Sequence, residues 1–161
     1  MIRFLSALIF GLFAVVHQPS MSLGACWDSL PGWSVTKTKH SYKDLIERLD
    51  AAVKANKMGL VTRASATLGA ASLGKTIPGN TVIGVFRPDF AIRMLEASVP
   101  AGIEAPIRFY ITENADGTAT LSYKKPTAVF APYADGGDKL KSMAIELDAI
   151  FAKIAGEATV P

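Results

Sequence analysis

Cysteine and histidine are scarce in this chain of 161 residues, which has one cysteine and two histidines. A disulfide needs two cysteines and a structural zinc site needs about four Cys or His ligands, so we expect neither within one chain. Excess charge is lacking too, because 17 basic and 14 acidic residues leave a formal charge of +3. No run of basic residues is longer than Lys124-Lys125, whereas nucleic-acid-binding domains usually carry a basic stripe. The sequence therefore predicts no metal site, and no nucleic acid as a partner.

The start of the chain lacks a hydrophobic run long enough to cross a membrane as a helix. The apolar stretch at residues 4–16 has thirteen residues, and a spanning helix needs about twenty. Arg3 precedes this stretch, and polar and small residues at 17–25 follow it, which is the arrangement of an export signal. We therefore expect residues 1–25 to be a signal peptide and the mature protein to be periplasmic or secreted.

The sequence Leu-Gly-Ala-Cys at residues 23–26 leaves three interpretations of this segment open. It resembles the cleavage box of bacterial lipoproteins, in which Cys26 would carry a lipid on its sulfur. Ordinary cleavage near Ala25 would instead leave Cys26 as a free thiol, and residues 17–22 separate the box from the apolar stretch in a way that is unusual for lipoproteins. A start at Met21 would give a cytoplasmic chain. Membrane association is expected only if Cys26 is lipidated, and residues 26–32 are expected to be an unstructured tether.

A single domain is expected over residues 33–158, because strand and helix patterns alternate from Trp33 onward. Apolar and polar residues alternate at 33–40, which predicts an edge or half-buried strand. A capping box at 41–44 predicts a helix that Gly59 ends. The further expected segments are a strand at 60–68, one helical turn at 70–73, a buried strand at 81–86, a helix from Pro88, a hairpin at 106–124, an apolar connector at 127–133 and a last helix capped by Gly136-Gly137-Asp138.

Apolar stripes at helical spacing mark the expected helices as surface helices packed on a sheet. The stripe of the helix from Pro88 is Phe90, Ala91, Met94 and Leu95. The stripe of the last helix is Leu140, Met143, Ala144, Leu147, Ile150, Phe151 and Ile154. Burying each such side chain contributes about 1.5–3 kcal/mol, so the helices and the sheet need one another. We therefore predict an α+β two-layer sandwich, with an antiparallel-rich sheet and helices packed on one face.

The hairpin is the segment whose register the sequence defines best, because its turn reads Asn-Ala-Asp-Gly. A two-residue turn would place Thr112 opposite Leu121 and would mismatch a polar and an apolar face. A three-residue loop at 115–117 places Ile111 opposite Leu121 instead. We predict this loop, which also gives Gly117 the left-handed conformation that such loops need.

Four short motifs follow one another in the second half of the domain. They are Phe86-Arg87-Pro88 at the end of an apolar strand, Pro106 at the start of another, a Glu-x-x-Asp-Gly turn at 113–117, and Leu121-Ser122-Tyr123 before Pro126. Their order and spacing resemble the domain of unknown function 302 family, and the likeness extends over about residues 33–155. The resemblance implies an α+β fold similar to a TATA-binding-protein-like half, a homodimer, and no established reaction.

The chain departs from this family where many relatives carry an Asp-His pair after an arginine. Here Arg63 is followed by Ala64, Ser65 and Ala66. Arg87 also stands in place of the usual asparagine before the proline. The resemblance therefore implies no histidine at this place that could act as a base or bind a metal.

A nucleophile beside a base, which covalent catalysis requires, is not evident in the sequence. His40 is interpreted as an exposed turn residue, and Cys26 lies in the tether. Glu104 and Glu113 lie at opposite ends of one expected strand, about 30 Å apart at the usual rise, so they cannot act on one bond. We expect no catalytic residue and no cofactor.

Arg87, Arg108 and Tyr110 are the candidate ligand-binding residues. A helix start at Pro88 presents free N–H groups that favour anions, and Arg87 and Arg108 could reinforce that site. Alternatively, Arg87 is a solvated residue that Asp89 neutralises. Tyr110 shares the polar face of the hairpin with Arg108, and this face could meet solvent, a second copy of the chain or a small ligand.

These observations predict an exported cell-envelope protein of unknown biochemical role. We expect it to be a non-enzymatic binding or interaction module that acts as a homodimer with a protein or small-molecule partner. Two alternatives stay open: an enzyme or cofactor-binding protein with an anion site near Arg87 and Arg108, and a structural lipoprotein anchored through Cys26.

Overall fold

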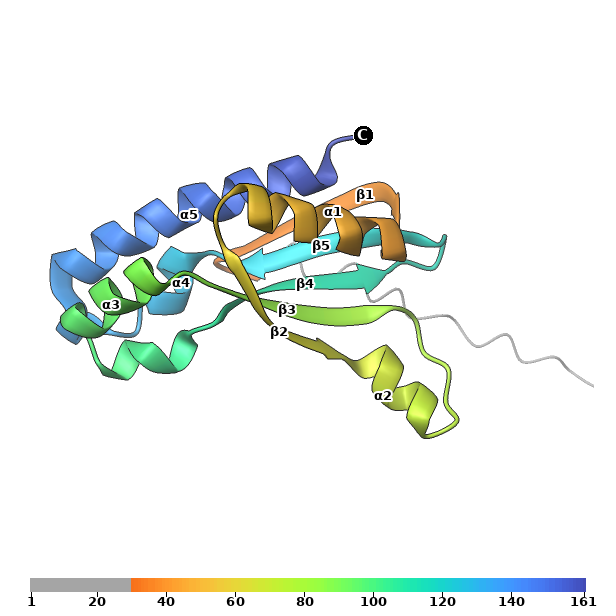
Figure 1. Ribbon diagram of the computed structural model, residues 1–161, viewed down its shortest axis with the longest axis horizontal. Helices are drawn as coiled ribbons and strands as arrows, with labels where there is room; N and C mark the ends of the chain where they lie inside the picture. The colour runs from red at the N-terminus through yellow and green to blue at the C-terminus, as the bar shows by residue number, and fades with distance from the viewer. Residues whose placement is uncertain (1–29) are drawn as a thin grey trace, which may run out of the picture.

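The structure, a computed structural model, describes residues 30–161, so the expected signal peptide and Cys26 lie outside the described residues. The described part contains a five-stranded antiparallel sheet in the order β1-β5-β4-β3-β2 (Figure 1). In chain order the elements are β1 (Trp33–Ser41), α1 (Tyr42–Ala55), β2 (Gly59–Ser65), α2 (Ala66–Ser72), β3 (Asn80–Phe86), α3 (Pro88–Ala97), η2 (Pro100–Glu104), β4 (Ile107–Glu113), β5 (Thr118–Lys124), α4 (Pro126–Phe130), η3 (Ala134–Gly136) and α5 (Gly137–Thr159).

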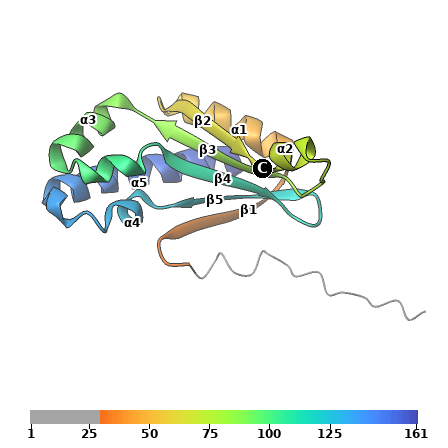
Figure 2. The ribbon, with the colours of Figure 1, turned by 90° about the horizontal axis from the view of Figure 1, so that it is seen from below.

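Two helices, α1 and α5, cover one face of the sheet. They lie above the strands in Figure 1, and Figure 2 shows the strands from the other side with both helices behind them. Phe109, Ile111 and Leu121 point into this layer and are at most 1 % exposed. Within residues 30–161 no long helix covers the opposite face, and no helix has both the length and the apolarity that a membrane span requires. The expected α+β two-layer class is confirmed.

Aromatic rings form the centre of the core between sheet and helices. The ring of Phe109 on β4 stacks on Phe151 of α5 at 4.6 Å, and Tyr123 on β5 meets Phe109 edge-on at 5.2 Å. The stripe predicted for the last helix is buried except for Ile150, which is half-buried and packs against the same core. The amphipathic pattern of α5 therefore predicted correctly which of its sides meets the sheet.

The hairpin has the predicted register and loop. Ile111 lies opposite Leu121, and Phe109 lies opposite Tyr123. The backbone N–H of Asn114 donates to the carbonyl of Thr118 at 2.8 Å, which closes the three-residue loop. Gly117 has φ of +80°, the left-handed conformation expected of it.

The first helix begins where its capping sequence predicts and ends earlier than expected. The Ser41 hydroxyl accepts a hydrogen bond from the Asp44 N–H at 3.2 Å. The helix ends at Ala55, because Lys57 adopts φ of +57° and turns the chain. Gly59 does not end the helix and instead begins β2.

Three other expectations about local structure were wrong. The strand predicted at 60–68 stops at Ser65, because the Ser65 hydroxyl accepts a hydrogen bond from the Leu68 N–H at 3.3 Å and caps α2. The helical turn expected at 70–73 lies mostly within this helix. The connector at 127–133 contains the helix α4, which the Asp148 carboxylate on α5 holds through the N–H and hydroxyl of Thr127. Leu95 is 47 % exposed, because α3 buries only its Phe90 and Met94 side.

Candidate functional site

The sheet face without long helices gathers side chains from strands that are distant in the sequence. Trp33 lies opposite Lys124 and Val35 lies opposite Ser122 across β1 and β5. Ser122 in turn lies opposite Tyr110 across β5 and β4. Opposite residues of antiparallel strands point to the same face, so these five side chains share one surface. The polar face predicted for the hairpin is thus one part of a wider, mixed surface.

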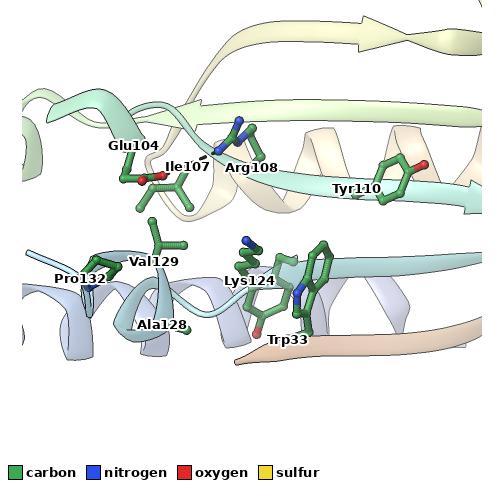
Figure 3. Close-up of a pocket in the computed structure, with 10 residues that line it drawn as sticks. Trp33, Glu104, Ile107, Arg108, Tyr110, Lys124, Ala128, Val129 and Pro132 are labelled. Carbon is green, nitrogen blue, oxygen red and sulfur yellow. Dashed lines mark ion pairs between the residues drawn. The ribbon is translucent and has the colours of Figure 1, made fainter. Parts of the chain in front are cut away.

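A groove of about 220 Å³ opens at the end of this face, where β4 begins and β5 ends. Figure 3 shows Glu104 and Arg108 along one side of the groove and Lys124, Trp33 and Val129 along the other. The groove therefore combines two cations, one carboxylate and the aromatic and apolar surface between them.

The charged side chains of the groove are unevenly paired. Glu104 accepts a hydrogen bond from the Tyr133 hydroxyl at 2.7 Å, and one of its oxygens lies 3.9 Å from Arg108. This hydrogen bond raises the pKa of Tyr133, so the hydroxyl keeps its proton at neutral pH. Within residues 30–161 Lys124 forms no ion pair, and its ammonium lies 5.7 Å from the centre of the Trp33 ring. Of the two groove cations, Arg108 therefore has a carboxylate nearby, and Lys124 has none among residues 30–161.

Close contact between Gly32 and α4 places Trp33 beside the groove. Gly32 has φ of +79°, and a Cβ at this position would lie 2.4 Å from the Cβ of Ala128. The N–H of Lys125 donates to the Gly32 carbonyl at 2.8 Å, which joins the start of β1 to the start of α4. Pro126 opens α4 with the backbone angle that a first helical turn needs. The groove wall therefore depends on a glycine before β1 and a proline after β5.

Two of the three predicted ligand-binding residues, Arg108 and Tyr110, line the groove. The Tyr110 hydroxyl accepts a hydrogen bond from the side-chain amide of Asn80 on β3. That hydroxyl is engaged toward β3, and Figure 3 shows the Tyr110 side chain beyond Arg108 along β4, with its hydroxyl directed away from the groove. Arg108 is 61 % exposed at the side chain, so it can reorient toward a ligand.

Arg87 does not join Arg108. Its guanidinium binds the Asp89 carboxylate with contacts of 2.7 and 3.0 Å and lies 4.2 Å from the centre of the Phe90 ring. The hydrogen bond from Arg87 lowers the pKa of Asp89, so this carboxylate stays charged at the start of α3. Arg87 lines a separate, small apolar cavity with Phe90 and Met94. Arg87 and Arg108 therefore do not line the same cavity. The guanidinium of Arg87 is already paired with the Asp89 carboxylate.

The titratable residues considered for catalysis have structural contacts in the described region. His40 is not an exposed turn residue: it lies in β1 with a side chain that is 10 % exposed. Its ring nitrogens lie 3.0 Å from the Asp44 carboxylate and 2.8 Å from the Val160 carbonyl. The Glu113 carboxylate accepts a hydrogen bond from the Gly79 N–H at 2.7 Å, whereas Glu104 accepts one from the Tyr133 hydroxyl. The two glutamates therefore have different partners. Within residues 30–161 no group of His, Cys, Asp and Glu could hold a metal ion.

Trp33 and Lys124 are two groove residues that the sequence patterns did not single out as candidates. They meet because β1 pairs with β5, and these strands are separated by most of the domain. The sequence signal for Trp33 was the alternation of β1, which placed Trp33 and Val35 on one face without naming the neighbouring strand. Lys124 belongs to the predicted hairpin itself. The pairing of β1 with β5 therefore adds Trp33 to a groove whose other strand residues come from the hairpin.

Comparisons with known proteins agree with this architecture. The crystal structure of an uncharacterized conserved protein DUF302 from Bacillus stearothermophilus is similar to the chain with a TM-score of 0.72. The two chains are 19 % identical, and the match covers 80 % of this chain and 99 % of the other, which shows a shared fold. No curated protein matches the chain. The family model described as domain of unknown function DUF302 matches residues 33–157, and the chain therefore belongs to that family.

Proposed function

We propose that this protein is a binding module whose groove between β4, β5, β1 and α4 takes a small molecule. The observation that carries the proposal is the groove itself, because concave sites with apolar walls and a few polar groups are the usual places of ligand binding. It lies on the sheet face without long helices and places Trp33, Tyr110, Arg108 and Lys124 around one volume.

A binding role accords better with the groove than a catalytic one. General acid–base catalysis needs a titratable group that can reach the substrate and exchange a proton with it. Glu104 is the acidic side chain of the groove, and Tyr133 and Arg108 already engage its oxygens. The alternative with an anion site shared by Arg87 and Arg108 is not proposed, because Asp89 engages Arg87 outside the groove.

Purification from the native source tests this function directly. We expect the protein to carry a small molecule that mass spectrometry detects under native conditions and that denaturation releases. Adding the released molecule back to ligand-free protein should change the fluorescence of Trp33, measured in a Trp27→Phe background so that Trp33 is the only tryptophan. Protein that repeatedly carries no molecule, and whose Trp33 responds to no extract fraction, would argue against a ligand site.

Export and self-association complete the proposal. The pattern of residues 1–25 supports export to the periplasm or beyond. The half-buried Val35 and Val82, which lie on the uncovered sheet face outside the groove lining, support a homodimer, because apolar side chains are favoured at the core of an interface. Light scattering over a range of concentrations should give twice the mass of one chain, and a single-chain mass at the highest concentration would remove the dimer from the proposal.

Processing at Cys26 decides between a free and an anchored protein. If the cysteine carries lipid, the chain is a lipoprotein, and Cys26→Ser should move it from the membrane fraction to the soluble fraction. The mass of the mature N-terminus distinguishes this case from ordinary cleavage near Ala25 and from a start at Met21. An unmodified N-terminus at Cys26 with no membrane association would exclude the anchor and leave the groove proposal intact.

A further inference from the structure

We infer that the groove takes an organic anion, a carboxylate carried on a flat aromatic body. This inference rests on the proposed function and adds the chemical class of the ligand.

Two cations lie on the neighbouring strands β4 and β5, one on each side of the groove. The pairing of β4 with β5 ends at Phe109 and Tyr123, and Arg108 and Lys124 are the residues next to that pair on the two strands. Like charges that face one another on neighbouring strands repel each other. Figure 3 shows both side chains at the groove. A bound anion between them would remove this repulsion, which a neutral or cationic ligand would not.

The Glu104 carboxylate does not balance the whole positive charge of the groove. Glu104 lies 3.9 Å from Arg108, and the Tyr133 hydroxyl holds its other oxygen at 2.7 Å. It thus balances at most one of the two cations. Lys124 forms no ion pair within residues 30–161, so the groove keeps a net positive charge beside the Trp33 ring.

The remaining walls favour a flat apolar body. Trp33 and Tyr110 contribute aromatic rings, and Ala128 and Val129 of α4 contribute aliphatic surface. Aromatic rings pack on one another in offset or edge-to-face geometries. The volume of about 220 Å³ is below the range of about 300–1,000 Å³ that is usual for ligand pockets, so the ligand is a single-ring molecule or part of a larger one.

Four small probes separate charge from shape. They are benzoate, its neutral analogue benzamide, its cationic analogue benzylamine, and acetate, which has the charge without the ring. Each is titrated into the full-length Trp27→Phe chain, and the NMR signal of the Trp33 indole N–H reports binding. We expect benzoate to bind at least about fivefold more tightly than each of the others, and its affinity to fall as salt is added.

Two neighbouring lysines provide a matched pair of variants. Lys124→Gln removes the unpaired cation of the groove, and Lys125→Gln removes an exposed cation that does not line it. We expect Lys124→Gln to weaken benzoate about two- to fivefold, the size of an exposed ion pair, and to leave benzamide unchanged. Lys125→Gln should leave both affinities unchanged.

The outcomes distinguish this inference from the proposed function. If benzamide or benzylamine binds as tightly as benzoate, the groove binds ligands and its preference for an anion is refuted. If acetate equals benzoate, the flat body is refuted. An equal loss in Lys124→Gln and Lys125→Gln would also overturn the inference, because it would assign the effect to general charge. If no probe shifts the Trp33 signal and the native protein carries no molecule, the binding function itself is wrong.

Discussion

At the scale of single residues, two glycines with positive φ have different reasons for being glycine. Gly117 has φ of +80° in the hairpin loop, and a Cβ there would meet nothing within 4 Å. Gly32 has φ of +79°, and a Cβ there would lie 2.4 Å from Ala128 on α4. The loop glycine therefore serves only the backbone conformation, whereas Gly32 also allows two segments to approach closely at the groove.

Replacing each glycine by alanine should separate these two costs. Gly117→Ala should lower the free energy of unfolding by about 1–2 kcal/mol, the cost of a left-handed conformation for a residue with a Cβ. Gly32→Ala should lower it by about 1–3 kcal/mol more, because the Cβ overpacks against α4. Urea unfolding measures both values. Equal losses in the two variants would show that α4 moves aside without cost, and that the groove wall does not depend on close approach at Gly32.

At the scale of elements, a charged pair on the surface links α3 to α5, whose apolar side chains also pack together. The Arg93 guanidinium binds both oxygens of Glu146, at 2.6 and 2.8 Å. This hydrogen bonding lowers the pKa of Glu146 and raises that of Arg93. Both side chains are about half exposed, so solvent screens the pair and its contribution to stability is small.

The stability conferred by this pair should depend on pH in one direction. Because the pKa of Glu146 is lower in the folded chain, its contribution is complete above the ordinary glutamate pKa and is lost as pH falls through the lowered value. Arg93→Gln should therefore destabilise the chain more at about pH 7 than at about pH 2. Urea unfolding across this range, with an NMR titration of Glu146, measures the effect.

A control for this prediction lies on α5 itself. Lys141 and Asp138 are 3.8 Å apart and strongly exposed, so Lys141→Gln should show no comparable difference between the two pH values. Arg93 also lies 5.2 Å from the Phe90 ring, and loss of that contact contributes a part that does not vary with pH. A constant difference between wild type and Arg93→Gln at every pH would assign the whole effect to Phe90.

At the scale of the whole molecule, one core joins the sheet to its helical layer, and in the described residues no long helix covers the other face. Phe109, Tyr123 and Phe151 form the centre of that core. Phe151 is fully buried, whereas Ile145 on the same helix is 62 % exposed. The two residues therefore test the division between the covered and the uncovered side of α5.

Truncating these two side chains should have very different effects on global stability. Phe151→Ala should lower the free energy of unfolding by about 3–5 kcal/mol, because it leaves a cavity between α5 and the sheet. Ile145→Ala should change it by about 0.5 kcal/mol or less, as is usual at exposed positions. Calorimetry or denaturant titration measures both. A large loss in Ile145→Ala would indicate that this residue is buried in an assembly of several chains.

The local patterns of the sequence were enough for several elements of this fold. The alternation in the hairpin selected the three-residue loop that pairs Ile111 with Leu121. Ser41 correctly predicted the start of α1, and the stripe of α5 predicted its buried side. These features depend on residues close together in the chain, so their spacing alone carries the information. The end of α1 was missed because Lys57 adopts a conformation that usually favours glycine.

What only the tertiary structure decided is which distant segments meet. Arg108 and Tyr110 were candidates from the sequence and Lys124 lies on the other strand of their hairpin, but Trp33 joins them because β1 pairs with β5 rather than with another strand. The separation of Arg87 from Arg108 likewise depends on the turn of the chain into α3. The pairing order of strands is set by the packing of the whole core, in which many contacts over long sequence distances act together. Residue spacing therefore determined the elements and their buried sides, and long-range pairing determined the groove.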